Sequence, residues 1–123
     1  MRPWPAWFSL GQRAPDSPEQ PLNRKLVVFV PAEALEAVRD AVFAAGAGRI
    51  GAYARCSWYA AGTGTFLGGE GTEPAVGERG VDERVPELRL ETIFPEERQD
   101  QVVAALRVAH PYEEPAFDVY PLL

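Results

Sequence analysis

Two segments of this chain carry the same strand-proline-helix pattern, 64 residues apart. In the first, the apolar run Lys25–Val30 reaches Pro31, and apolar residues then recur at helical spacing over Ala32–Ala45. In the second, Leu88–Phe94 reaches Pro95, and a similar helix is expected over Glu96–Ala109. The matching pairs are Pro31 and Pro95, Glu33 and Glu97, Val38 and Val102, Ala41 and Ala105, Val42 and Leu106, and Ala45 and Ala109. A duplicated strand-helix unit is therefore predicted.

Each predicted helix is followed by further strand. Arg49–Ala60 is expected to be a second strand, and Gly62–Phe66 a tight connection between strands with a short strand of its own. A long loop is predicted over Gly68–Glu83, and Ala116–Tyr120 is expected to be the last strand. The order β-α-β-β-α-β is the ferredoxin-like, split βαβ arrangement of an α+β protein with an antiparallel sheet. Two helices cover one sheet face, so a neighbouring subunit is expected on the other.

Composition divides the chain into a tail and one domain. Five of the twelve prolines fall in residues 1–24, where no hydrophobic period is visible, so this stretch is expected to be a flexible tail. Trp4 and Trp7 in that tail either pack loosely or anchor a partner protein. Residues 25–123 are expected to form a single domain.

Charge and cysteine content exclude several classes of protein. A net charge of −6 and a pI of about 4.8 disfavour a nucleic-acid partner and an anionic membrane surface. No window holds the roughly 18 apolar residues of a membrane span. The single cysteine, Cys56, cannot form an internal disulfide. A cytoplasmic protein is predicted.

Six segments together resemble one known module: Lys25–Pro31, Gly48–Tyr53, Cys56–Ser57, Gly62–Phe66, Glu91–Pro95 and His110–Leu122. The module is the CutA/PII-like domain of the Nif-three-like (YqfO-type) dinuclear-metal proteins, which also occurs as a free-standing protein. The His-Pro-Tyr-Glu element, residues 110–113, is also similar to the corresponding segment of CutA, the divalent-cation-tolerance protein. The resemblance implies a ferredoxin-like fold and a trimer. It does not imply the two-metal chemistry of the full-length proteins, whose flanking domains are not expected here, so a non-enzyme is predicted.

His110 is the only histidine, and two interpretations of it remain open. At the end of a helix that Pro111 stops, it can hydrogen-bond terminal carbonyls and serve structure alone. Alternatively, His110 with Glu113, Glu114 and Cys56 offers the nitrogen, oxygen and sulfur ligands that Cu or Zn accept. The resemblance to CutA favours the second interpretation, and a trimer could gather ligands from several chains.

A second candidate site is the run Gly62, Thr63, Gly64 and Thr65, which could form a backbone nest for an anionic cofactor. The run lacks the lysine of a phosphate-binding loop, so a simple strand connection is the alternative. Taken together, the sequence predicts a small regulatory or binding protein with a metal or ligand site near the His-Pro-Tyr-Glu motif. The alternative is a ligand-free oligomeric scaffold for a protein partner.

Overall fold

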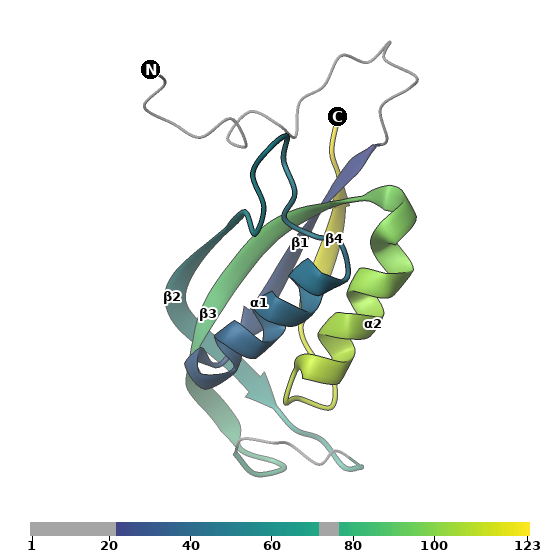
Figure 1. Ribbon diagram of the computed structural model, residues 1–123. Coiled ribbons are helices and arrows are strands. Elements are labelled where there is room, and N and C mark those ends of the chain that lie inside the picture. The colour runs from purple at the N-terminus through teal and green to yellow at the C-terminus, as the bar shows by residue number, and fades with distance from the viewer. Residues whose placement is uncertain (1–21, 72–76) are drawn as a thin grey trace.

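The structure, a computed structural model, describes residues 22–71 and 77–123 (Figure 1). Most of the predicted tail therefore lies outside the described residues, although its last two residues, Asn23 and Arg24, belong to β1. The elements in order are β1 (Asn23–Val30), the short 3₁₀ helix η2 (Ala32–Ala34), α1 (Leu35–Ala44), β2 (Ser57–Leu67), β3 (Asp82–Pro95), the 3₁₀ helix η3 (Glu96–Arg98), α2 (Gln99–Ala109) and β4 (Phe117–Pro121). The predicted β-α-β-β-α-β order is confirmed.

The four strands form one antiparallel sheet in the order β2-β3-β1-β4. The strand β1 lies in the interior, where Val28 pairs with Leu90 of β3 on one side and with Phe117 of β4 on the other. The two outer strands are therefore β2 and β4. The predicted α+β class with an antiparallel sheet is confirmed.

The two strand-helix units have nearly the same backbone. Pro31 and Pro95 both have extended dihedrals, with φ of −66° and −70°, and each begins a single 3₁₀ turn. Ala34 and Arg98 then occupy equivalent positions, with φ of −99° and −98°, before each chain enters its α-helix. Proline suits this junction because its fixed φ and missing N–H cost nothing where a helix begins.

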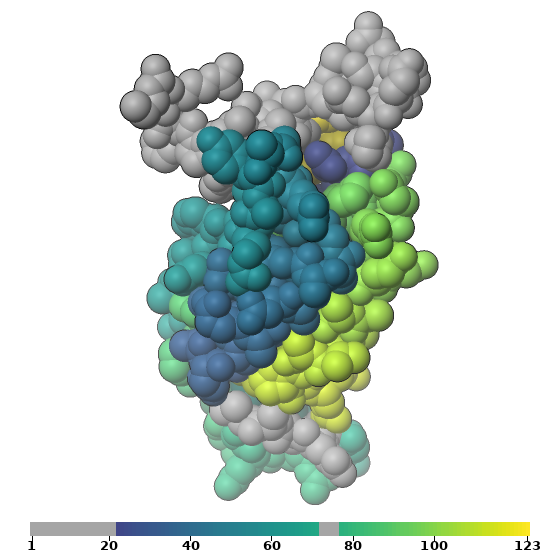
Figure 2. Space-filling view, in the orientation of Figure 1, coloured from purple at the N-terminus to yellow at the C-terminus, as the bar shows by residue number. Residues whose placement is uncertain are grey.

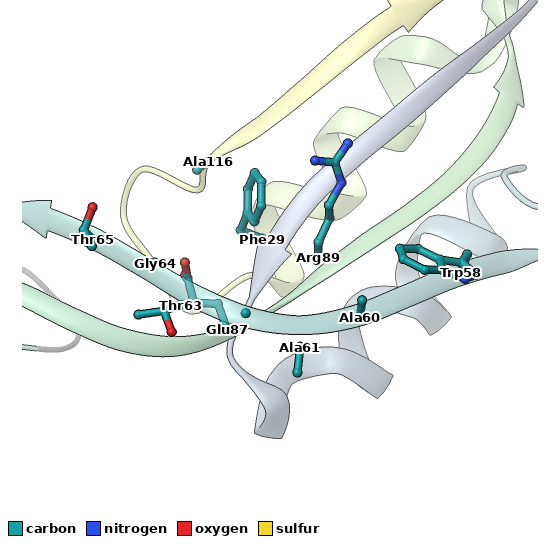
Figure 3. A pocket seen from close by; sticks show the side chains of 11 residues that line it. Phe29, Trp58, Ala60, Ala61, Thr63, Gly64, Thr65, Glu87, Arg89 and Ala116 are labelled. Carbon is teal, nitrogen blue, oxygen red and sulfur yellow. The ribbon is translucent and has the colours of Figure 1, made fainter.

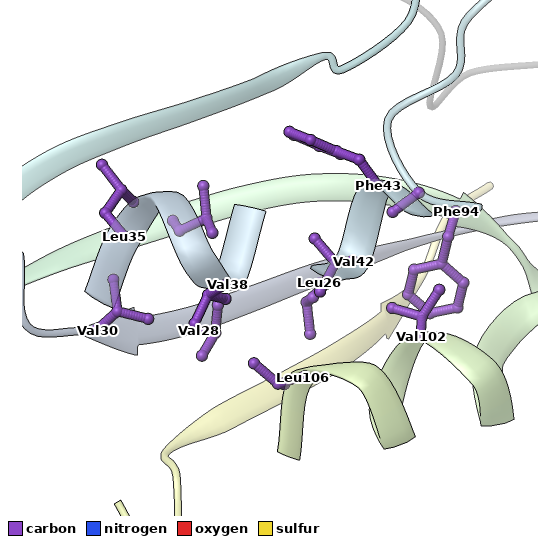
Figure 4. Close-up of a cluster of buried hydrophobic side chains, with 12 residues drawn as sticks. Leu26, Val28, Val30, Leu35, Val38, Val42, Phe43, Phe94, Val102 and Leu106 are labelled. Carbon is purple, nitrogen blue, oxygen red and sulfur yellow. The ribbon is translucent and has the colours of Figure 1, made fainter. Parts of the chain in front are cut away.

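Both helices pack on the same face of the sheet (Figures 1 and 2). Because strand residues alternate between faces, every second residue of β1 points toward the helices. The buried cluster between sheet and helices is shown in Figure 4 and contains Leu26, Val28, Val30, Leu35, Val38, Val42, Phe43, Ala47, Leu90, Phe94, Val102 and Leu106. Each fully buried aliphatic side chain contributes about 1.5–3 kcal/mol by leaving water. The apolar residues that recur at equivalent positions of the two strand-helix units therefore form the core that stabilises the fold.

Two local predictions were wrong. Residues 49–56 are not strand, because Gly51 and Arg55 have φ of 59° and 58°, and Ile50 pairs back to Tyr53 across a tight turn. The run 62–66 is not a connection between strands but lies inside β2. Its glycines are extended and face β3, which starts at Asp82 rather than at the predicted Leu88. The actual connection follows Leu67, within the predicted long loop.

Candidate functional site

His110 closes α2 and is held by both of its ring nitrogens. Only 5% of the residue is exposed. Its Nδ1 accepts a hydrogen bond from the backbone N–H of Tyr112 at 3.1 Å, and its Nε2 lies 2.8 Å from the carbonyl oxygen of Phe29. Because Nδ1 accepts, the ring proton lies on Nε2, which donates to Phe29. The histidine therefore ties the end of α2 and the following loop to the end of β1.

The structure does not gather the four predicted metal ligands within one chain. Cys56 immediately precedes β2, and there its carbonyl accepts from Thr92 Oγ1 and its Sγ donates to the Ala54 carbonyl. Burial raises the pKa of the Cys56 thiol, which disfavours the thiolate that binds metals. Among the residues described, no group of three or more histidine, cysteine, aspartate or glutamate side chains could hold a metal ion.

Glu113 and Glu114 follow Tyr112 and are exposed. A Cu or Zn site that combines them with His110 from several chains stays a prediction. Such a site would require His110 to give up one of its two hydrogen bonds, since neither ring nitrogen has a spare lone pair in this geometry.

A hollow of about 490 Å³ opens near the end of β1 (Figure 3). Its lining combines two aromatic rings, a guanidinium, a carboxylate and several small residues: Phe29, Trp58, Ala60, Ala61, Gly62, Thr63, Gly64, Thr65, Glu87, Arg89 and Ala116. All four residues of the predicted cofactor site thus lie in its wall. They contribute an extended strand rather than a backbone nest, because Gly62 and Gly64 pair with Glu87 and Val85 of β3. Ligand binding by this pocket stays a prediction.

The pocket residues Arg89 and Phe29 were missed from the sequence. Arg89 Nε donates to Glu91 at 3.0 Å, and Lys25 Nζ lies 3.1 Å from the other oxygen of the same carboxylate. The Arg89 guanidinium also lies 6.0 Å from the centre of the Phe29 ring. The alternation of polar and apolar residues in β3 could have placed Arg89 and Glu91 on the face away from the helices.

Tyr112 lies against His110 within the His-Pro-Tyr-Glu motif. Its ring lies 4.9 Å from the His110 ring, centre to centre. Burial raises the pKa of the Tyr112 hydroxyl, and the negative charges of Glu87 and Glu33 raise that pKa further. The motif therefore reaches the pocket wall through His110, which bonds Phe29.

The raised pKa of Tyr112 predicts a loss of stability in alkali. A hydroxyl whose pKa is higher in the folded chain contributes stability below its unfolded value of about 10, and this contribution disappears as pH rises through the folded pKa. We expect the free energy of unfolding to decline above about pH 10, and to decline less steeply in Tyr112→Phe. Urea unfolding of both chains between pH 8 and about pH 11 measures the slopes. Equal slopes would contradict this assignment.

Comparison with known proteins locates the chain among its relatives. No protein-family model matches it. Over 99 residues it is 56% identical to a GTP cyclohydrolase 1 type 2 homolog of Mycobacterium tuberculosis, covering 80% of this chain and 26% of that protein. A crystal structure of a Bacillus cereus protein related to NIF3 aligns with a TM-score of 0.73 at 49% identity, over 83% of this chain and 26% of that chain. The chain is a homologue of one domain of the NIF3-related proteins. The predicted resemblance is confirmed.

This NIF3-related domain spans about a quarter of the length of the relatives it matches. Two more distant structures share its fold. The periplasmic divalent cation tolerance protein CutA of Archaeoglobus fulgidus aligns with a TM-score of 0.60 at 15% identity, over 81% of this chain and 83% of that one. The GlnK structure of Bacillus subtilis aligns with a TM-score of 0.55 at 15% identity, over 82% and 85%. The CutA/PII-like fold is therefore confirmed. No helix in the described part of the chain is long and apolar enough to cross a membrane.

Proposed function

We propose that this NIF3-related domain is a non-enzymatic binding or regulatory module of the cytoplasm. It assembles with copies of itself and takes a small ligand in the pocket beside the His-Pro-Tyr-Glu motif. One observation carries the proposal: His110 of the motif is hydrogen-bonded to Phe29, a residue of the pocket wall. A change in the pocket can therefore reach the loop after α2 through direct contacts.

The outer edge of β2 supports self-association. This strand is eleven residues long, stands at the end of the sheet, and contains neither a charged residue nor a proline. Natural proteins usually protect such an edge with lysine, proline or a covering element, because its unpaired backbone groups recruit another strand. On the face away from the helices, Trp58 and Tyr120 are 50% and 46% exposed at opposite edges of the sheet. These features suit a second copy, and the CutA/PII-like fold favours a trimer.

The metal form of the proposal, with Cu or Zn at His110, is the less supported one. Both ring nitrogens of His110 are already hydrogen-bonded, and Cys56 lies just before β2, where its carbonyl accepts from Thr92. The pocket, with its aromatic lining, is better suited to an organic ligand. A ligand-free scaffold is the second candidate, and the unprotected edge of β2 favours it equally.

Self-association is tested by placing a charge on the β2 edge. We expect sedimentation velocity to give the mass of three chains for the wild type and of one chain for Ala61→Lys, because a lysine opposes pairing at an edge strand. Ala104→Lys, at a position on α2 that is also exposed, should sediment as the wild type does. A wild type that sediments as a single chain at micromolar concentration would remove this half of the proposal.

Calorimetric titration and thermal melts separate the module from the scaffold. Cu²⁺, Zn²⁺ and a panel of nucleotides serve as probes of the two candidate sites. Binding of a nucleotide that Trp58→Ala abolishes supports the pocket, and binding of a metal that His110→Ala abolishes supports the motif. A melting temperature that no probe changes favours the scaffold.

A further inference from the structure

The start of β1, the end of β4 and the loop after α1 all lie at one end of the sheet, which we call the pole. Arg24 of β1 pairs there with Pro121 of β4. The loop, residues 46–56, reaches the same place, because the N–H of Gly48 bonds the carbonyl of Ile93 at 2.7 Å, and Ile93 precedes the β3 residue that pairs with Arg24. In Figure 1 this loop projects at the end of the sheet where β1 begins and β4 ends. Any chain that continues beyond either end of the domain therefore leaves from the pole.

The loop at the pole is held in a defined shape. Ile50 and Tyr53 exchange two backbone hydrogen bonds across its turn, at 3.0 and 2.9 Å. Arg55 has a φ of 58°, in the left-handed region that residues other than glycine enter at a cost. Its guanidinium lies 4.8 Å from the centre of the Phe43 ring and 2.7 Å from the Asp40 carboxylate. The loop is thus ordered before any partner binds, which lowers the entropy that binding must lose.

This ordered loop presents apolar and basic side chains to solvent. Tyr53 is 57% exposed, and Arg49 is exposed as well. Leu22, Tyr120 and Leu123 add exposed apolar surface at the same pole. The loop contains two arginines and no acidic residue, in a chain whose net charge is −6. Tyrosine and arginine are enriched in protein interfaces, so the pole suits a protein surface that offers apolar side chains and carboxylates.

The relatives of this domain supply a candidate for that partner. The matching stretch is only 26% of the Mycobacterium tuberculosis and Bacillus cereus proteins, so most of each chain lies outside the domain and joins it at the pole. We propose that the pole, with Tyr53 and Arg49 in its loop, is a docking surface for the part of a NIF3-related protein that lies outside this domain. The proposal depends neither on the pocket nor on self-association through β2.

Labelling with hydroxyl radicals, read residue by residue, tests the docking surface. The matching stretch of the Mycobacterium tuberculosis relative is replaced by the corresponding residues of this chain, and the chimera is compared with the free chain. Because interface residues lose most of their exposure, we expect Tyr53 to be labelled at least about fivefold less in the chimera. Leu67, which is 61% exposed at the far end of β2, should be labelled equally in both. Both proteins carry Ala61→Lys, so that a second copy paired through β2 cannot cause the difference.

Charge reversal makes the test specific. Arg49→Glu should restore the labelling of Tyr53 in the chimera and leave the free chain unchanged, because the new carboxylate repels an acidic partner surface. Arg79→Glu, at an exposed arginine beyond the far end of β2, should change neither protein. Equal labelling of Tyr53 in the chimera and the free chain would overturn the proposal. So would protection of Tyr53 in the free chain that disappears when residues 1–21 are deleted, since the occupant would then be this chain's own N-terminal segment.

The Mycobacterium tuberculosis relative as it stands provides a second measurement that needs no chimera. We expect its stretch aligned with residues 49–55 to exchange amide hydrogens at least about fivefold more slowly than this free chain does, after correction for the intrinsic rates of the two sequences. The stretch aligned with β1 serves as the reference for the stability of the domain. Equal exchange of the two loops would contradict the docking surface even if the chimera did not fold.

Discussion

Replacing Leu106 by alanine is expected to lower the free energy of unfolding by about 2–5 kcal/mol. Leu106 is 0% exposed and lies in the cluster that joins α2 to α1 and to the sheet. The substitution removes the transfer energy of the lost methyl groups and leaves a cavity that the surrounding residues only partly fill. Because small domains are stabilised by only about 5–15 kcal/mol, this single change removes a large fraction of the total. Urea unfolding followed by circular dichroism measures it.

The matched control is Leu123→Ala. Leu123 is 95% exposed, so the same chemical change there should alter stability by no more than about 0.5 kcal/mol. If Leu106→Ala were as mild as Leu123→Ala, α2 would not pack on the sheet through this residue. Val42 occupies the equivalent position of α1 and is buried in the same cluster. A mild Leu106→Ala would therefore also mean that equivalent positions of the two helices do not play the same part in the core.

The fold could be predicted because its signals are local and occur twice. Pro31 and Pro95 each mark the junction of strand and helix, and their dihedrals depend on the proline ring rather than on distant contacts. The helix stripes are equally local, since Val38 and Val102 identify the buried side of each helix by spacing alone. Two copies of one pattern made the assignment stronger than either copy would have been.

The course of the chain from residue 49 to residue 67 could not be predicted in the same way. Glycine is compatible with a turn and with a strand, and only the partner strand decides between them. Gly51 has a positive φ and turns the chain, whereas Gly62 and Gly64 are extended because β3 continues beside them. The sequence pattern of β3 before Leu88 contains Pro86 and charged residues, which concealed the pairing.

The candidate site was only partly predictable for a related reason. The motif and the glycine run were both identified, but Phe29, which lies in the pocket wall and bonds His110, comes from another strand. Nothing near His110 in the sequence indicates that the Phe29 carbonyl, 81 residues away, accepts its proton. Long-range pairing of this kind decides whether a histidine is a ligand or a structural residue.

His110→Ala is expected to lower the free energy of unfolding by about 2–4 kcal/mol, since an unsatisfied buried polar group costs about 1–3 kcal/mol. The variant removes the partner of the Phe29 carbonyl and of the Tyr112 N–H together. It also leaves a cavity at a nearly sealed position, between the end of α2 and β1. Urea unfolding at pH 8 measures the loss, and Tyr112→Phe provides a comparison that keeps the Tyr112 N–H in place.

Chelation separates the two interpretations of His110. If the histidine acts through its two hydrogen bonds, EDTA leaves the wild-type midpoint unchanged, and His110→Ala loses the same stability with or without chelator. If instead it binds Cu²⁺ or Zn²⁺, the metal raises the midpoint of the wild type and EDTA reverses that rise, while His110→Ala responds to neither. The hydrogen-bond geometry favours the first result, because a metal could reach a ring nitrogen only after the Phe29 or the Tyr112 contact had broken. A metal-dependent midpoint that His110→Ala abolishes would show that the loop after α2 opens to expose the ring.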